Sequence, residues 1–137
     1  MPHILIVEDE ASTAWALAEG LSDDGFTIDT FASAEAALRW LEHASSDLVI
    51  TDFRLPGMSG LDLAKKLSRG ANAQPVIIVT AYGTPEVLGQ LRAAGIADCF
   101  SKPFQIDQLR QSVRRALAAT PVRKPRRAAR MPRSKAA

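Results

Sequence analysis

Residues 48–52 read Leu-Val-Ile-Thr-Asp, an uninterrupted apolar run that ends on a carboxylate. Three other short apolar runs end on polar residues: residues 4–7 lead into two acids, residues 76–79 into a threonine, and residues 97–101 into a lysine. If these runs are parallel strands of one sheet, their carboxyl ends lie at one edge, which is where open α/β sheets bind ligands. We therefore expect a reactive, acidic site at that edge.

Strand-like and helix-like patterns alternate five times along the chain. Apolar residues recur at helical spacing in residues 14–21, 34–41, 61–67, 87–94 and 106–117. Three of the strand-like runs are continuously apolar, which indicates burial on both faces, whereas residues 26–31 and 97–101 contain polar residues and suit the edges of a sheet. The pattern predicts an α/β fold, a doubly wound (βα)5 sandwich with parallel strands, and we adopt the common order 2-1-3-4-5.

Length and composition restrict the class of protein. The chain has 137 residues, enough for one domain with a core of its own. A single cysteine excludes an intramolecular disulfide, and no stretch resembles a signal peptide or a membrane span, so we expect a cytoplasmic protein with no membrane contact. We assign residues 1–118 to the folded domain and residues 119–137 to a basic, disordered tail, which holds seven Lys or Arg and no acid.

The polar residues at the strand ends suggest phosphoryl chemistry. In the predicted strand order Asp9 and Asp52 follow neighbouring strands, and adjacent carboxylates repel one another unless a cation neutralises them. An all-oxygen acidic site favours Mg²⁺ where a phosphate is also a ligand. Asp52 is the candidate nucleophile, because carboxylates form aspartyl-phosphate intermediates. Thr80 and Lys102 are expected to bind phosphoryl oxygens.

Four motifs in this order resemble the receiver domain of two-component response regulators. They are Ile-Val-Glu-Asp-Glu (6–10), Ile-Thr-Asp-Phe-Arg-Leu-Pro-Gly-Met-Ser-Gly (50–60), Val-Thr-Ala-Tyr-Gly (79–83) and Ser-Lys-Pro-Phe (101–104). The resemblance covers residues 3 to about 118. It implies a flavodoxin-like sandwich and transfer of a phosphoryl group to Asp52 from a histidine kinase or a histidine phosphotransfer protein.

The resemblance also implies particular roles for the site residues. Magnesium would be held by Asp9, Asp52 and the backbone carbonyl of Arg54, with Glu8 as a supporting acid. Thr80 and Lys102 would sense the phosphoryl group. The peptide bond between Lys102 and Pro103 would be cis, as the Lys-Pro bond of this family usually is.

Three positions bear on how phosphorylation is read and how long it lasts. Receiver domains generally carry an aromatic residue three positions before the lysine, but this chain has Cys99 there, and Phe100 should face the opposite side of the strand. The switch must therefore work differently from one that relies on that ring. Arg54 and Tyr82 flank the predicted phosphoryl site, and both are large enough to screen it from water.

Other interpretations remain open from the sequence. The acids after the first strand could simply cap the next helix, and the fold could serve as a pseudo-receiver that is never phosphorylated, or as an enzyme or cofactor carrier. We expect no enzyme activity beyond self-phosphorylation and slow autodephosphorylation. Output would pass to a downstream protein target, with a homodimer possible, and the basic tail could bind nucleic acid. His3 and His43 are expected at the surface, and Trp15 and Trp40 in packing roles.

Overall fold

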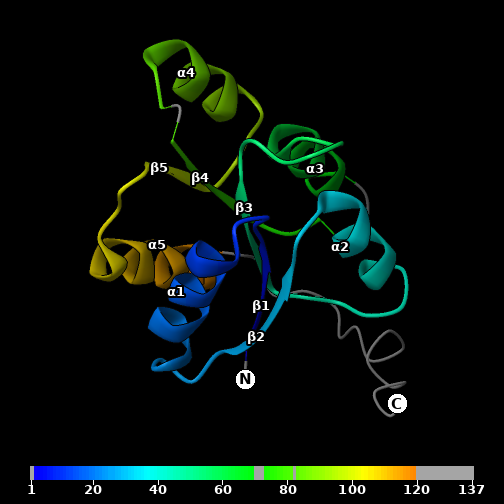
Figure 1. The fold of residues 1–137 in the computed structure, drawn as a ribbon, viewed down its shortest axis with the longest axis vertical. Coiled ribbons are helices and arrows are strands. Elements are labelled where there is room, and N and C mark those ends of the chain that lie inside the picture. The colour runs from blue at the N-terminus through cyan, green and yellow to red at the C-terminus, as the bar shows by residue number, and fades with distance from the viewer. Residues whose placement is uncertain (1, 70–72, 82, 120–137) are drawn as a thin grey trace.

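Five parallel strands form a central sheet that is covered by helices on both faces (Figure 1). The computed structural model describes residues 2–69, 73–81 and 83–119. The strands are β1 (His3–Val7), β2 (Thr27–Phe31), β3 (Leu48–Asp52), β4 (Val76–Thr80) and β5 (Asp98–Ser101). They lie in the order β2-β1-β3-β4-β5, and every neighbouring pair is parallel. The predicted doubly wound order is therefore confirmed.

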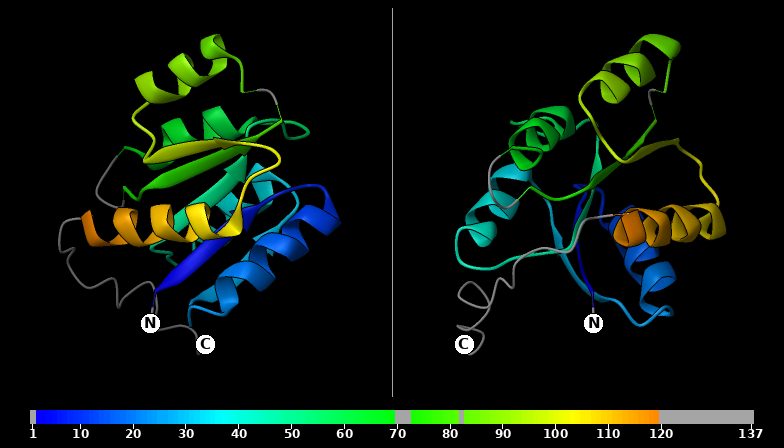
Figure 2. Two further views of the ribbon diagram at one scale, coloured as in Figure 1. Left: turned by 90° about the vertical axis from the view of Figure 1, so that its left-hand side faces the viewer. Right: turned by 180° about the vertical axis from the view of Figure 1, so that it is seen from behind.

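Five helices alternate with the strands and divide between the two faces of the sheet. They are α1 (Ala11–Ser22), α2 (Ala34–Leu41), α3 (Gly60–Leu67), α4 (Pro85–Ala93) and α5 (Ile106–Ala119). Helices α1 and α5 pack on one face, and α2, α3 and α4 cover the other, as the two views of Figure 2 show. Each strand therefore sends alternate side chains into two separate apolar layers.

Burial along the strands follows the hydrophobicity of their sequences. Every residue of β3 and of β4 is buried, whereas β2 and β5, which form the two edges of the sheet, are largely half-buried or exposed. Strands covered by helices on both faces need apolar residues at successive positions, but edge strands do not. The prediction that the two diluted strands lie at the edges is confirmed.

Hydrogen bonds from side chains fix the starts of three helices. The hydroxyl groups of Ser33, Ser59 and Thr84 accept hydrogen bonds from backbone N–H groups three residues later, at the starts of α2, α3 and α4. These residues satisfy donors that have no partner inside the helix. Pro85 occupies the first turn of α4, where its missing N–H costs nothing.

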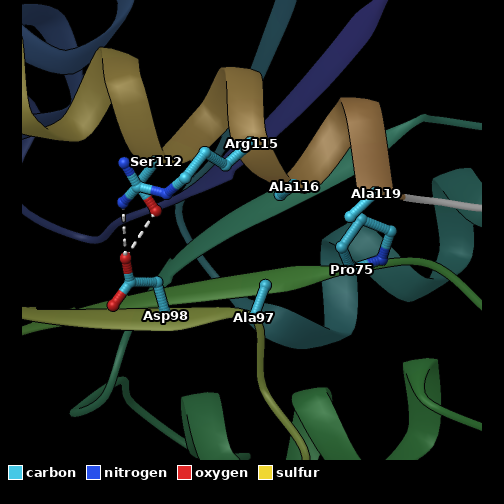
Figure 3. Close-up of a pocket in the computed structure, with 7 residues that line it drawn as sticks. All are labelled: Pro75, Ala97, Asp98, Ser112, Arg115, Ala116 and Ala119. Atoms are coloured by element: carbon cyan, nitrogen blue, oxygen red, sulfur yellow. Dashed lines mark hydrogen bonds and ion pairs between the residues drawn. The ribbon is translucent and has the colours of Figure 1, made fainter.

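Polar side chains also form contacts near the amino ends of the strands. Asp98, at the start of β5, accepts hydrogen bonds from the Ser112 hydroxyl at 2.7 Å and from its neighbour's backbone N–H, and it lies 3.6 Å from Arg115 (Figure 3). These residues line a hollow of about 310 Å³ beside the second half of α5. The acid in this hollow, Asp98, is paired with an alcohol and a guanidinium.

The two histidines lie in different environments. His43 is exposed as expected, but the side chain of His3 is only 15% exposed. The His3 ring stacks on Trp40 at a centroid distance of 5.0 Å and lies 2.7 Å from a carboxylate oxygen of Asp29. The expectation that His3 is a surface residue is therefore wrong, because the start of β1 is covered by α2.

Helix α5 ends at Ala119, one residue past the predicted domain boundary. The basic tail itself lies outside the described residues, so its predicted disorder stays a prediction. Among the helices described here, none combines the length and the apolar character needed to cross a membrane.

Candidate functional site

The carboxyl edge of the sheet brings three acids together. Glu8 and Asp9 follow β1 directly, and Asp52 is the last residue of β3, the next strand in the sheet. Val7 of β1 pairs with Thr51 of β3, so the acids that follow these two residues lie at the same height along the sheet. Each acid offers a carboxylate oxygen, and all three oxygens lie within 4.8 Å of one another. Glu8 and Asp52 are buried, whereas Asp9 is exposed to the solvent.

Lys102 reaches this cluster from the loop after β5. Its ammonium Nζ donates hydrogen bonds to Glu8 Oε1 at 3.1 Å and to Asp52 Oδ2 at 3.3 Å. Its side chain is 19% exposed, so the ion pairs are shielded from bulk water. The backbone N–H of Lys102 donates to the carbonyl of Thr80 at 2.7 Å, and the bond between Lys102 and Pro103 is cis. The lysine therefore spans from β5, past β4, to the ends of β3 and β1.

Burial and charge change the acidity of two groups in this cluster. Burial raises the pKa of the Glu8 carboxyl, and the hydrogen bonds from Lys102 and from the backbone N–H of Glu10 only partly oppose this effect. Burial alone would lower the pKa of Lys102, but the hydrogen bond to Glu8 and the charge of Asp52 outweigh it, so that the pKa of Lys102 is raised. The lysine therefore stays protonated, and the cluster holds three carboxyl groups against one ammonium.

This donor set suits a hard divalent cation. All three side chains offer oxygen, and one of them faces the solvent, where an ion with its own water molecules can enter. No cysteine or histidine takes part in this cluster, which disfavours a softer metal. The residues present therefore fit Mg²⁺ or a similar ion, which would relieve the repulsion between the acids.

Thr80 ends β4 beside this cluster. It is fully buried, and its strand partner is Ser101, whereas Asp52 pairs with Val79 on the other side of β4. Thr80 therefore lies one residue further along the carboxyl edge than the partner of Asp52. Tyr82, which we predicted at the rim of the site, falls outside the described residues.

The loop between β3 and α3 packs closely around Asp52. The backbone N–H of Arg54 donates to Asp52 Oδ1 at 3.4 Å. Gly60 begins α3 directly against the strand, and a Cβ atom at this position would collide with the backbone oxygen of Asp52. Only glycine allows this approach. No role was predicted for Gly60 from the sequence. A glycine directly after a helix-capping serine could have indicated a close approach between the start of α3 and the strand.

Beside the acids, an open hollow of about 460 Å³ separates the start of α1 from the loop after β2. Glu8 and Asp9 line it together with Trp15, whose 67% exposure is exceptional for a large apolar residue. The expectation of a packing role for Trp15 is therefore wrong. In contrast, Trp40 is half-buried and packs with His3 and Phe31.

Cys99 and Phe100 point to opposite faces of β5. Cys99 packs against the apolar layer under α2, α3 and α4, and Phe100 packs against the layer under α1 and α5. Burial raises the pKa of the Cys99 thiol, so the thiolate is disfavoured. Cys99 therefore acts as a small apolar residue in this structure, and no aromatic ring stands in its place.

Comparison with known proteins agrees with this fold. The chain matches the response regulator receiver domain over residues 4–114. It is 39% identical over 106 residues to the two-component response regulator PhoP of Pseudomonas aeruginosa, covering 77% of this chain and 47% of that protein. It is 37% identical over 115 residues to the C4-dicarboxylate transport transcriptional regulatory protein DctD of Rhizobium meliloti, covering 84% of this chain and 25% of that protein.

Solved structures show the same relationship. A putative response regulator from Chloroflexus aurantiacus superposes with a TM-score of 0.81 at 30% identity, covering 85% of this chain and 98% of that structure. The structure titled FixJ-N superposes with a TM-score of 0.80 at 29% identity, covering 89% and 98%.

Sheet order, acidic edge and bridging lysine thus define a phosphoacceptor type of α/β domain. The chain belongs to the receiver domain family of two-component response regulators. It spans less than half the length of the two curated relatives named above. Phosphorylation and Mg²⁺ binding are general properties of this family.

Proposed function

We propose that the chain accepts a phosphoryl group on Asp52 from a phosphohistidine of a histidine kinase or a histidine phosphotransfer protein. The observation that supports this proposal best is the convergence of Glu8, Asp9 and Asp52 within 4.8 Å, with Lys102 bonded to two of them. Asp9, Asp52 and the backbone carbonyl of Arg54 would hold Mg²⁺, with Glu8 in support. The folded unit would comprise residues 1–118 and act in the cytoplasm.

The bound ion would supply charge neutralisation between an anionic carboxylate and an anionic phosphoryl group. The residues of the chain orient the reaction. A carboxylate oxygen of Asp52 attacks phosphorus, the bond from phosphorus to the histidine nitrogen breaks, and that nitrogen keeps the electron pair. No general base is required, because an aspartate nucleophile attacks as the carboxylate.

Lys102 is placed to follow the charge as it moves from Asp52 to the phosphoryl group. It donates to Asp52 Oδ2 in the unphosphorylated chain, and once the carboxylate becomes an acyl phosphate, a phosphoryl oxygen offers the stronger acceptor. Glu8 remains as its second partner and keeps the ammonium at the site. The hydroxyl group of Thr80 would bond another phosphoryl oxygen. This pair of contacts carries the signal to the loops after β4 and β5.

We place the phosphodonor over the mouth of the site, beside α1. Trp15 offers a large apolar surface next to the hollow that contains Glu8 and Asp9. Buried aromatic residues dominate protein interfaces, so this ring is the natural contact for the donor protein. Trp15→Ala should slow transfer from the donor protein and leave labelling by acetyl phosphate unchanged. Equal transfer rates would reject this docking face.

The test of the proposal is phosphorylation itself. Purified protein is incubated with acetyl phosphate and Mg²⁺, and the phosphoryl adduct is followed by intact-mass spectrometry. The wild-type chain should gain one phosphoryl group, which Asp52→Ala and omission of Mg²⁺ both abolish. Asp62→Ala, an exposed acid on α3, is the control and should label normally. An unlabelled wild-type chain would indicate a pseudo-receiver, and flavin absorbance in the purified protein would indicate a cofactor carrier.

The lifetime of the phosphoryl group should depend on Arg54 and Tyr82, which we place at its rim. The double variant Arg54→Ala, Tyr82→Ala should release phosphate faster, because small side chains leave the acyl phosphate open to water. Phosphate release is timed after the donor is removed. Equal rates in both proteins would reject the shielding.

The switch would work without an aromatic ring at position 99. Cys99→Tyr should leave phosphorylation intact but change the affinity for a downstream protein partner, which beryllofluoride-dependent pull-down can identify. Unchanged affinity in both phosphorylation states would exclude a switch role for this position. We expect the chain to catalyse no reaction other than its own phosphorylation and slow dephosphorylation.

A further inference from the structure

The loop between β3 and α3 must adopt one backbone conformation if the carbonyl of Arg54 is to face the acids. Two bonds close the ends of this loop: the N–H of Arg54 donates to Asp52 Oδ1, and the N–H of Gly60 donates to the carbonyl of Phe53 at 2.9 Å. Both bonds join residues that are near in sequence. They leave the middle of the loop to be fixed by another part of the molecule.

Glu35, in the first turn of α2, makes that contact. Its carboxylate Oε2 accepts a hydrogen bond from the backbone N–H of Met58 at 2.8 Å, across 23 residues of sequence. Gly57 has φ +76°, and a Cβ atom at this position would lie 2.6 Å from Glu35 Oε2. Gly57 is therefore required both for the left-handed turn and for the close approach of the carboxylate.

Charge favours this contact as well. The N–H of Met58, followed by the N–H of Glu35 itself, lowers the pKa of the Glu35 carboxyl, so it remains ionised at neutral pH. A negative charge in the first turn of a helix also interacts favourably with the helix dipole. Hydrogen bonds to an ionised acceptor are stronger than those between neutral groups.

Apolar contacts hold the side chains of the loop but do not orient its peptide groups. Leu55 and Met58 pack against the layer that contains Ala34 and Ala37 of α2. Dispersion contacts of this kind are not directional. The bond from Met58 to Glu35 is directional, and it joins the loop to the same helix.

We propose that Glu35 is a positioning residue for the magnesium site. By fixing the N–H of Met58, it holds the β3–α3 loop in the conformation that presents the carbonyl of Arg54 to the ion. This inference rests on the function proposed above. It adds α2, which supplies none of the acids, to the parts of the chain that determine metal affinity.

Three variants separate this role from charge and from stability. Glu35→Ala removes the acceptor and the charge, whereas Glu35→Gln removes the charge and keeps an acceptor oxygen. Ser33→Ala removes the N-cap of the same helix, whose hydroxyl accepts from Ala36 at 3.1 Å, without touching the loop. Mg²⁺ affinity is measured by calorimetry, and exchange of the Met58 amide hydrogen is measured by NMR on the protein without metal.

Glu35→Ala should weaken Mg²⁺ binding roughly 10-fold, as the loss of residues that orient metal ligands commonly does, while Glu35→Gln should restore most of the affinity. Ser33→Ala should bind Mg²⁺ like the wild type. The Met58 amide should exchange faster in Glu35→Ala only.

Each contrary result has a distinct meaning. If the wild type binds Mg²⁺ and Glu35→Ala binds it equally well, the positioning role is overturned and the proposed function stands. If Glu35→Gln loses as much affinity as Glu35→Ala, charge and not the bond to Met58 is responsible, and the role is again overturned. If the wild type binds no Mg²⁺, the proposed function fails, and the positioning role fails with it.

Discussion

Polar groups at the two ends of the sheet differ in how completely they are paired. At the amino end, Ser46 and Gln74 hydrogen-bond to each other, and Asp98 is bonded to Ser112 and approached by Arg115. At the carboxyl end, three acids lie together, and a single lysine pairs with two of them, Glu8 and Asp52. Ser46, Gln74 and Asp98 each have a partner at the amino end, although His3 Nδ1 is buried there without one among the described residues, whereas negative charge is in excess at the carboxyl end.

This difference distinguishes polar groups that are paired within the fold from polar groups that are available to bind a ligand. A buried polar group costs little when it is paired, but an unpaired buried charge is expensive. The paired groups at the amino end therefore cost little, whereas the excess of negative charge at the carboxyl end carries a cost that an incoming cation can relieve. The same sheet thus has one end where most polar groups are paired and another where excess negative charge lowers stability but favours cation binding.

The largest effect on stability is expected from Lys102→Ala without metal. Removing the only ammonium among the described residues of the acid cluster leaves Glu8 and Asp52 buried without a cation, which should lower the free energy of unfolding by about 3 kcal/mol. Urea unfolding at neutral pH measures it. Lys66→Ala, an exposed lysine on α3, is the control and should change little. A Lys102 variant as stable as the control would mean that the acids are not strained.

Magnesium should have the next largest effect, because the proposed function places its binding site at the acidic end of the folded chain. At a free concentration 100 times its Kd, the ion should add about 2.7 kcal/mol to the free energy of unfolding. Asp9→Ala should remove this increment, and Asp62→Ala should keep it. Thermal unfolding with and without Mg²⁺ gives the values. An increment that survives in Asp9→Ala would place the ion elsewhere.

At the amino end, Ser46→Ala should destabilise the protein by about 2 kcal/mol, because it leaves the buried amide of Gln74 without its partner. The Mg²⁺ increment should be unchanged, since Ser46 and Gln74 lie at the end of the sheet opposite the acids. Urea unfolding in both conditions tests this. A smaller Mg²⁺ increment in Ser46→Ala would show that the ends are coupled.

The smallest effect is a pH dependence that arises from Glu8. Its pKa is raised above the ordinary value of 4.5, so the folded chain binds this proton more tightly than the unfolded chain does. The contribution of Glu8 to stability without metal is therefore fully present below pH 4.5 and is lost as the pH rises through the raised pKa. Glu8→Gln should flatten the stability profile in this range. An unchanged profile would assign the dependence to another group.

The sequence alone determined the strands, their edge positions and most of the acidic cluster. Continuous apolar runs specify buried parallel strands, and parallel strands bring their carboxyl ends to one edge. Together with the adopted strand order 2-1-3-4-5, this reasoning places Glu8, Asp9, Asp52, Thr80 and Lys102 near one another. The helix caps Ser59 and Thr84 also act locally, on backbone N–H groups three residues later. These features depend on periodicity and on neighbours within a few residues.

Only the tertiary structure decided which groups from distant segments touch. The burial of His3 under α2, the exposure of Trp15, the bond from Lys102 to Glu8 and the contact between Glu35 and Met58 all join segments far apart in the chain or depend on what covers them. The physical reason is that hydrophobic patterning fixes which face of an element is buried, whereas pairing of side chains depends on how elements pack against one another.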